Sequence, residues 1–338
     1  MVRFFENHSL KPHNTFGVES TARYFFEFTE VVDLDNFFNS DIISEDLPFL
    51  VLGGGSNILF VNDFEGLVLH PNIPGIKSIK EDRQNIWLET GAGELWDDFV
   101  KYCVDLDLGG VENLSLIPGS VGAAPVQNIG AYGQEVADII ELVRGYDIDL
   151  KKIVEFSARQ CEFAYRDSIF KRNLKNRLII TSVVFRLDKY PEYNLTYGQL
   201  EENVNSFGKK TLHNIRKAVT EIRSSKLPDV KQLCNAGSFF KNPVVSTEIA
   251  EKIRSAFPLM PCYSAGSEKV KLAAGWLIEM AGWKGYREKD AGVHEKQALV
   301  LVNHGNATGK EIFGLSEKIR RSVFEKFGIT LEREVNCI

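Results

Sequence analysis

The chain has 338 residues, a length that predicts two or three domains rather than one. Hydrophobic residues make up 44% and charged residues 25%, as in ordinary soluble globular proteins. Lys and Arg number 40 against 46 Asp and Glu, which gives a formal net charge of -6. A diffuse nucleic-acid binder would usually be basic, so that class of protein is disfavoured.

The cysteines are odd in number, widely spaced and form no CxxC pair: Cys103, Cys161, Cys234, Cys262 and Cys337. This pattern supports neither a disulfide framework nor a structural zinc site, and we expect no bound metal. Residues 1–11 contain no apolar signal-peptide core, and we expect a cytoplasmic protein.

In the first two thirds of the chain the patterns favour short strands and turns. An apolar run over 49–52 predicts a strand, and residues 86–89 predict another. Residues 95–102 fit a short helix. The region 140–188 holds β-rich runs and ends in a predicted strand over 178–187.

The last third changes character after a composition shift near 190–210, the best candidate for a domain boundary. Apolar residues at helical spacing predict a helix over 211–223. A second helix begins with a capping box, Thr308 to Glu311, and ends at Gly328. Its predicted apolar face comprises Ile312, Leu315, Ile319, Val323 and Phe327. Alternation over 329–335 predicts a final strand, so the fold class is α+β.

The first glycine-rich loop, 53–57, follows a predicted strand. Glycine lets backbone N–H groups approach a phosphate closely, because it has no Cβ and accepts unusual dihedral angles. The loop is not a Rossmann fingerprint, since Ile58 stands where that motif needs glycine, and the chain contains no P-loop motif. A plain tight turn is an equally good interpretation of this loop alone.

The segment 113–134 contains no charged residue, but its glycines, prolines and amides would break a membrane helix. Within it, small residues allow close backbone approach, while Ser and amide side chains offer neutral hydrogen bonds. A pyrophosphate held here would rely on oriented N–H groups instead of Lys or Arg. Such a surface suits a large anionic cofactor; a buried structural loop is the alternative.

Six motifs are distributed along the chain: GGGSN at 53–57, IPGSVGAAPVQNIGAYG at 117–133, YRDSIFK at 165–171, LTYGQL at 195–200, SKLPD at 225–229 and NAGSFFKNP at 235–243. Through these motifs the sequence resembles the UDP-N-acetylenolpyruvoylglucosamine reductase family over nearly its whole length. The residues Tyr165, Tyr197 and a segment around Tyr263 resemble the type I branch of that family.

The resemblance implies a vanillyl-alcohol oxidase-like FAD-binding fold followed by a smaller α+β substrate domain. We expect FAD-binding subdomains at 1–70 and 71–205, a substrate-binding domain at 206–328, and a returning strand at 329–338. FAD would be bound non-covalently, and no His lies between His70 and His213 to link it. The implied cofactor-binding residues are Gly53, Gly54, Gly55, Ser56, Asn57, Ser115, Ile117, Pro118, Gly119, Ser120, Gly122, Ala123, Gln127, Asn128, Gly130, Tyr132 and Gly133.

The implied reaction reduces the enolpyruvyl ether of UDP-N-acetylglucosamine to UDP-N-acetylmuramate, a step of peptidoglycan precursor synthesis. NADPH is the implied reductant, and reduced FAD delivers hydride to the terminal vinyl carbon. Charge then develops on the adjacent carbon and spreads into the carboxylate, so the site needs a cation or hydrogen bonds there and a proton donor for that carbon.

The resemblance assigns these catalytic roles to three residues. Arg166 would stabilise the carboxylate, because a guanidinium stays charged and binds carboxylates bidentately. Ser238 would donate the proton, and Glu334 would assist at the carboxylate end. Without the motifs, an ion pair between Arg166 and Asp167, a turn or N-cap serine and a solvent-facing glutamate are the ordinary interpretations.

Residues at the family's positions for the UDP-sugar, its diphosphate or the nicotinamide cofactor are Tyr165, Tyr197, Lys226, Asn242, Tyr263, Lys284 and Gln297. Tyr263 would lie on a loop that closes over the nucleotide. We expect a monomer that binds neither nucleic acid nor a membrane. Two other functions stay open: an alcohol or aldehyde oxidase of the same flavoprotein fold, and a sugar-nucleotide-binding protein without catalysis.

Overall fold

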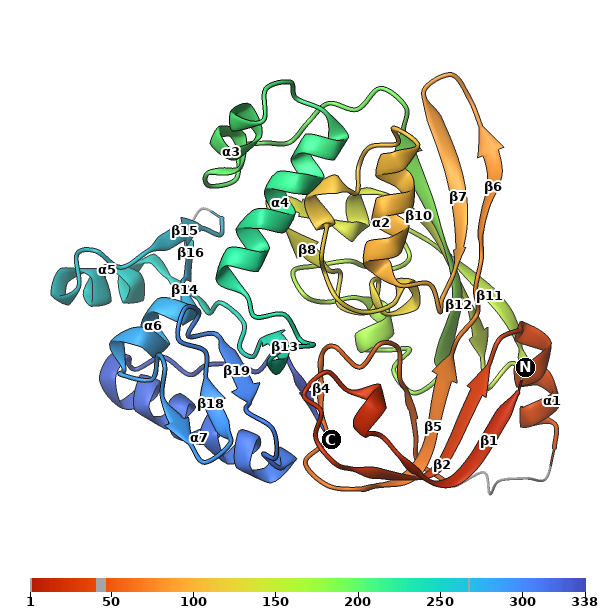
Figure 1. The fold of residues 1–338 in the computed structure, drawn as a ribbon, viewed down its shortest axis with the longest axis horizontal. Coiled ribbons are helices and arrows are strands. Elements are labelled where there is room, and N and C mark those ends of the chain that lie inside the picture. The colour runs from red at the N-terminus through yellow and green to blue at the C-terminus, as the bar shows by residue number, and fades with distance from the viewer. Residues whose placement is uncertain (1, 41–46, 267) are drawn as a thin grey trace. The chain divides into compact units, whose positions relative to one another are not determined.

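The computed structural model describes residues 2–40, 47–266 and 268–338 (Figure 1). These residues form two compact units. Unit 1 comprises the described residues of 1–8, 22–55 and 65–223, and unit 2 comprises those of 9–21, 56–64 and 224–338. The chain passes from unit 1 to unit 2 inside the first glycine-rich loop, between Gly55 and Ser56.

Unit 1 is built mainly on two sheets. The first has the order β1-β2-β5-β3, in which β3 and β5 are parallel, and the second is antiparallel with the order β11-β10-β12-β7-β6. The strands are β1 (Arg3–Ser9), β2 (Thr21–Phe28), β3 (Phe49–Val51), β5 (Phe64–Pro71), β6 (Ile76–Glu81), β7 (Asn85–Gly91), β8 (Gly130–Ala131), β9 (Gln134–Glu135), β10 (Ile140–Asp147), β11 (Lys152–Ser157) and β12 (Leu178–Asp188).

The helices of unit 1 include α1 (Val31–Phe38), α2 (Trp96–Asp105) and α3 (Leu200–Ser206), while α4 (Leu212–Lys226) passes into unit 2 at Ser224. Trp96 and Phe99 of α2 bury their rings against Phe185 of β12, with centroids 5.8 and 4.7 Å apart. This aromatic contact holds α2 on the five-stranded sheet, and α2 precedes the second glycine-rich loop in the chain.

Unit 2 contains the sheets β13-β19-β18-β17 and β14-β16-β15, and β20 pairs with β4 in parallel. Its strands are β4 (Ile58–Leu59), β13 (Cys234–Ser238), β14 (Val244–Ser246), β15 (Cys262–Ser264), β16 (Lys269–Leu272), β17 (Arg287–Glu288), β18 (Ala291–Val293), β19 (Val300–Asn303) and β20 (Asn336–Cys337). Its further helices are α5 (Thr247–Ala256), α6 (Ala274–Met280) and α7 (Gly309–Phe327). None of the helices in the described ranges combines the length and the apolar run that crossing a bilayer requires.

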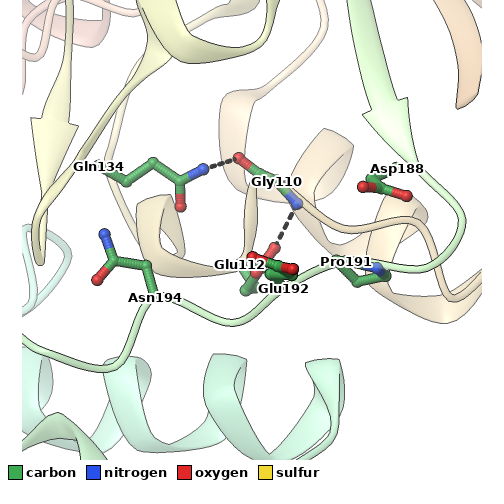
Figure 2. Close-up of a pocket in the computed structure, with 7 residues that line it drawn as sticks. All are labelled: Gly110, Glu112, Gln134, Asp188, Pro191, Glu192 and Asn194. Atoms are coloured by element: carbon green, nitrogen blue, oxygen red, sulfur yellow. Dashed lines mark hydrogen bonds between the residues drawn. The ribbon is translucent and has the colours of Figure 1, made fainter.

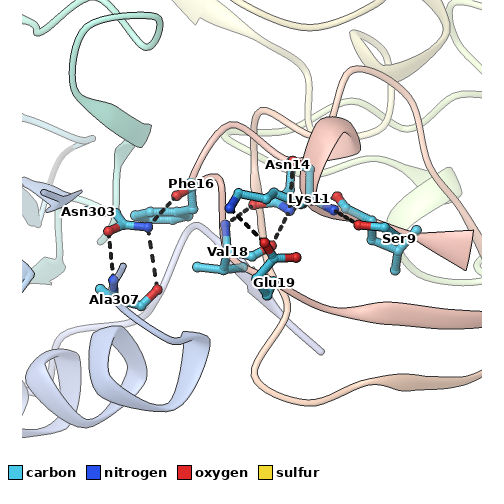
Figure 3. Close-up of polar contacts among 9 residues, drawn as sticks. Ser9, Lys11, Asn14, Phe16, Val18, Glu19, Asn303 and Ala307 are labelled. Atoms are coloured by element: carbon cyan, nitrogen blue, oxygen red, sulfur yellow. Dashed lines mark hydrogen bonds and ion pairs between the residues drawn. The ribbon is translucent and has the colours of Figure 1, made fainter. Parts of the chain in front are cut away.

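Two buried asparagines shape the first loop of unit 2 (Figure 3). Asn14 donates to the carbonyls of Leu10 and Val18 and accepts from the Val18 N–H, which closes the loop on itself. Asn303, at the end of β19, donates to the Phe16 carbonyl at 2.9 Å and accepts from the Ala307 N–H at the same distance. Because buried polar groups need such partners, these amides fix the loop against β19 and the entry to α7.

The predicted elements over 49–52, 86–89, 95–102, 178–187 and 211–223 are confirmed as β3, β7, α2, β12 and α4. Helix α7 is also confirmed, with Thr308 as N-cap, Glu311 completing the capping box and Gly328 as C-cap at φ 69°. Its five predicted apolar residues are all buried.

The predicted strand over 329–335 is wrong. Ile329, Leu331 and Val335 are buried in alternation, as the sequence pattern indicates, but the segment makes only an isolated bridge, between Arg333 and Phe240. Alternation predicts which side chains are buried, whereas a strand also needs a ladder of backbone partners. Only Asn336–Cys337 forms a strand here, β20.

The N-cap of α7 can be tested for its contribution to stability. The Thr308 hydroxyl accepts from the Glu311 N–H at 3.2 Å, and the Glu311 carboxylate accepts from the Thr308 N–H at 2.9 Å. We expect Thr308→Ala to lower the free energy of unfolding by about 1 kcal/mol, measured by urea denaturation. Thr308→Ser keeps the hydroxyl and should stay close to the wild type; equal losses in both variants would contradict this account.

Candidate active site

The two glycine-rich loops lie against each other within unit 1. A Cβ built on Gly54 would lie 3.0 Å from the Gly119 Cα, and one built on Gly53 would lie 2.5 Å from the Ser120 Oγ. Side chains larger than hydrogen therefore do not fit between the loops without a shift of backbone or hydroxyl. This close approach is the feature expected of backbone N–H groups gathered to hold an anionic cofactor.

The second loop is fixed by backbone bonds to its surroundings. The Gly119 carbonyl accepts from the Trp96 N–H at 3.0 Å, and the Gly122 N–H donates to the Ala92 carbonyl at 3.0 Å. A Cβ on Gly122 would come within 2.6 Å of the Ala92 Cβ. These backbone contacts restrain the path of the loop, which lowers the cost of binding a ligand there.

The Tyr165-Arg166 motif docks onto the same loop. The Arg166 guanidinium donates to the carbonyls of Asn128 at 3.3 Å and Gly130 at 2.9 Å. The Ser168 hydroxyl donates to the Val126 carbonyl at 2.6 Å. Arg166 has φ 55°, a left-handed conformation that costs free energy for a side-chain-bearing residue and is most often found at functional sites.

Asp167 forms an ion pair with Arg172, in which its carboxylate lies 3.1 Å from the Arg172 Nε. The Arg166 Cζ lies 5.5 Å from the centre of the Tyr165 ring. The Arg166 guanidinium adds a positive charge beside the segment 113–134, which has no charged residue of its own.

Ser238 lies in unit 2 at the end of β13, at an irregularity of the sheet. Between Asn235 and Ser238, β13 has one residue more than its partner β19. Gly237 takes up the bulge at φ 68°, and its N–H donates to the Asn235 side chain at 2.9 Å. A bulge re-aims the side chain that follows it, here the half-buried Ser238, and such bulges are frequent beside active sites.

Glu334 of unit 2 is bonded through its backbone to the residue that follows Ser238. The Glu334 N–H donates to the carbonyl of Phe239, the residue after Ser238, at 2.9 Å. The Glu334 carbonyl accepts from the Asn57 side chain at 3.1 Å. The two backbone segments that carry the predicted catalytic residues of unit 2 therefore lie side by side, and the Asn57 side chain is bonded to the second of them.

The predicted substrate residues of unit 1 also gather at the second loop. The Tyr197 ring meets the Tyr132 ring edge-on with centroids 5.7 Å apart. The Asn113 side chain, which is fully buried, donates to the carbonyls of both Tyr132 and Asn194. Asn113 thereby ties the loop to the segment that carries Tyr197, a role that the sequence analysis did not identify.

The predicted substrate residues of unit 2 fall into two groups. Asn242 accepts from the Ala274 N–H at 2.9 Å, and Gln297 lies against the adjacent Gly275, so both meet the start of α6. Lys284 lies 2.8 Å from Glu279, which neutralises much of its charge. Tyr263 on β15 and Lys226 at the end of α4 are exposed, and the structure does not join them to either group.

The sequence analysis also missed Arg223 on α4. Burial lowers the pKa of its guanidinium, and the nearby Arg166 charge acts in the same direction. Its Nε is buried and has no hydrogen-bond partner among the described residues. Arg216 pairs with Asp97 and lies seven residues before Arg223, so both arginines are on the same face of α4. This seven-residue spacing of two arginines is the sequence signal that could have identified Arg223.

A separate pocket of about 280 Å³ in unit 1 is not the cradle (Figure 2). Its lining includes the carboxylates of Glu112, Asp188 and Glu192, and burial raises the pKa of Glu112. The Glu112 carboxylate accepts from the Gly110 N–H at 2.7 Å. An acidic lining repels a diphosphate, so the chemistry favours the glycine-rich loops over this pocket.

Comparisons with known proteins identify the relatives of this chain. Residues 41–151 match the model of an FAD binding domain, and residues 229–338 match the C-terminal domain of UDP-N-acetylenolpyruvoylglucosamine reductase. The reductase of that name from Flavobacterium johnsoniae is 46% identical over 98% of both chains, and that from Pseudomonas putida is 45% identical over 99% of both. The Thermus caldophilus enzyme structure matches 100% of this chain and 98% of its own, with a TM-score of 0.68 and 24% identity.

The match to an FAD binding domain and the full-length likeness in fold define an FAD-binding flavoprotein with a further α+β part, which confirms the predicted fold class. At this identity over nearly the full length, the chain belongs to the UDP-N-acetylenolpyruvoylglucosamine reductase family. It is an FAD-containing oxidoreductase, so the interpretation as a non-catalytic binding protein is wrong.

The close contact between the two glycine-rich loops predicts that one added methyl group at Gly54 weakens FAD binding. Gly54→Ala would press its Cβ against the Gly119 backbone and separate the loops, so we expect the Kd for FAD to rise about tenfold, measured by flavin fluorescence. Gly314→Ala on α7 is the matched control, because a Cβ there meets nothing within 4 Å. An unchanged Kd for Gly54→Ala would show that the loops do not hold the cofactor.

Proposed function

We propose that this protein reduces the enolpyruvyl ether of UDP-N-acetylglucosamine to UDP-N-acetylmuramate with NADPH as reductant. The observation that carries the proposal is the docking of Arg166 on the carbonyls of Asn128 and Gly130, because it adds a cation to an uncharged cofactor loop. Bound FAD would supply the hydride, after taking it from NADPH. A cytoplasmic monomer acting in peptidoglycan precursor synthesis is part of the same proposal.

Arg166 would bind the carboxylate of the enolpyruvyl group. Two of its nitrogen atoms are held by backbone carbonyls, so the guanidinium plane is fixed before substrate arrives. When hydride adds to the terminal vinyl carbon, negative charge moves to the adjacent carbon and into the carboxylate. A fixed cation there stabilises this charge more than that of the ground state, which lowers the barrier.

Ser238 would donate the proton to the carbon that bears the ether oxygen. A serine hydroxyl is a weak acid, but a carbanion-like carbon is a strong enough base to accept its proton. The bulge at Gly237 and the buried rings of Phe239 and Phe240 fix the backbone on both sides of Ser238. That fixation is what proton transfer at a defined carbon requires.

Glu334 would act at the carboxylate end of the same group. Its backbone bonds to Phe239 and Asn57 keep it next to Ser238. Tyr165 and Tyr197 would contact the substrate from the second loop, and Asn242 and Gln297 would bind the nucleotide near α6. Lys226, Tyr263 and Lys284 would act on the diphosphate, with Lys284 sharing its charge with Glu279.

The role of Ser238 separates the two half-reactions. We expect Ser238→Ala to leave flavin reduction by NADPH near the wild-type rate, because that step needs no proton at the substrate carbon. Reoxidation by the enolpyruvyl substrate should slow by on the order of 10³. Anaerobic stopped-flow absorbance of the flavin measures both rates, and equal slowing of both would count against Ser238 as the proton donor.

The role of Arg166 depends on its two-pronged geometry rather than its charge alone. Arg166→Lys keeps the charge but loses the fork, so we expect kcat/KM for the enolpyruvyl substrate to fall by about 10²-fold or more. Arg172→Lys is the matched control, since Arg172 pairs with Asp167 and Glu162 instead of the loop. Near-normal turnover of Arg166→Lys would refute the carboxylate assignment.

A further inference from the structure

His70 on β5 lies where the first glycine-rich loop begins. Its Nδ1 is 2.7 Å from the carbonyl oxygen of Leu52, the residue before Gly53. A carbonyl can only accept a hydrogen bond, so this Nδ1 carries the proton. The Leu52 N–H donates to the Leu69 carbonyl at 2.8 Å, so neighbouring residues of β5 hold both polar groups of the Leu52 backbone.

The opposite side of the imidazole is also held. The Nε2 of His70 lies 3.9 Å from the Glu27 carboxylate on β2, and the two side chains are only 18% and 12% exposed. The His70 ring also contacts the Phe25 ring, with centroids 5.6 Å apart. Arg3 lies 3.4 Å from the same carboxylate. The ring is therefore restrained by packing against Phe25 and by the hydrogen bond to Leu52.

The hydrogen bond from His70 to Leu52 fixes the orientation of more than the Leu52 carbonyl. The Leu52 carbonyl and the Gly53 N–H belong to one planar trans peptide, so they point in opposite directions. Fixing the carbonyl therefore fixes the direction of the Gly53 N–H. The restraint matters because glycine tolerates both signs of φ, and the Gly53-Gly54 pair could otherwise turn its peptide planes at little cost.

We propose that His70 is a positioning residue for the cofactor loop: it sets the Leu52–Gly53 peptide plane and so aims the Gly53 N–H within the cradle. This inference rests on the proposed role of the loop in holding FAD. His70 itself lies on the sheet and acts through the backbone of Leu52. None of the motifs in the sequence includes it.

The test compares three side chains at position 70 in the full-length protein stripped of flavin. His70→Phe keeps the ring but has no donor, and we expect its Kd for FAD to rise about tenfold for one lost hydrogen bond. His70→Asn places an amide N–H near the position of Nδ1, and it should recover affinity to within about threefold of wild type. His213→Phe on α4 is the control, because His213 is exposed beside Asp105, and its Kd should not change.

A second readout does not depend on FAD. Amide hydrogen exchange at Gly53 in the flavin-free protein should be faster in His70→Phe than in the wild type and normal in His70→Asn. Wild-type affinity for FAD in His70→Phe, or an equal loss of affinity in His70→Phe and His70→Asn, would overturn the inference. If His70→Phe does not fold, His70→Leu and His70→Asn give the same comparison. A wild type that binds no FAD would refute the proposed function, while the exchange result alone would still decide the role of His70.

Discussion

The candidate cofactor site depends on the close approach of the two glycine-rich loops. Gly53 and Gly54 come so close to Gly119 and Ser120 that a methyl group would displace one of them. This contact requires glycine for steric reasons, and it leaves the cradle with N–H groups and hydroxyls in place of cations. The positive charge of unit 1 at this site comes from outside the loop, from Arg166 and the partly buried Arg223.

The residues with a proposed catalytic role are divided between the two units. Unit 1 contains the contact between the loops and the arginine docked on it, and its geometry is set by backbone carbonyls. Unit 2 contains Ser238 and Glu334, which are set by a β-bulge and by the backbone of Phe239. In both units, backbone contacts position the residue to which a catalytic role is proposed, as preorganised electrostatic stabilisation requires.

Sequence patterns predicted those features whose causes are local. The stripe from Ile312 to Phe327 and the capping box at Thr308 predicted α7, because helix period and caps act within a few residues. Alternation over 329–335 predicted burial but not pairing, since a ladder depends on a partner far along the chain. The same limit applies to the contact of Arg166 with Gly130 and of His70 with Leu52, which join residues that no local pattern relates. The roles of Arg166 and Ser238 rested on family motifs alone.

The end of the chain is connected to the candidate site. The Ile338 carbonyl accepts from the Val61 N–H at 2.6 Å, and the Asn336 N–H donates to the Asn57 carbonyl at 3.1 Å, so β20 secures the backbone just after Glu334. A substitution that disturbs the pairing of β20 with β4 would change neither Glu334 nor Asn57. It would nevertheless loosen the backbone of both residues at once, because the β20 strand follows Glu334 and is bonded to Asn57.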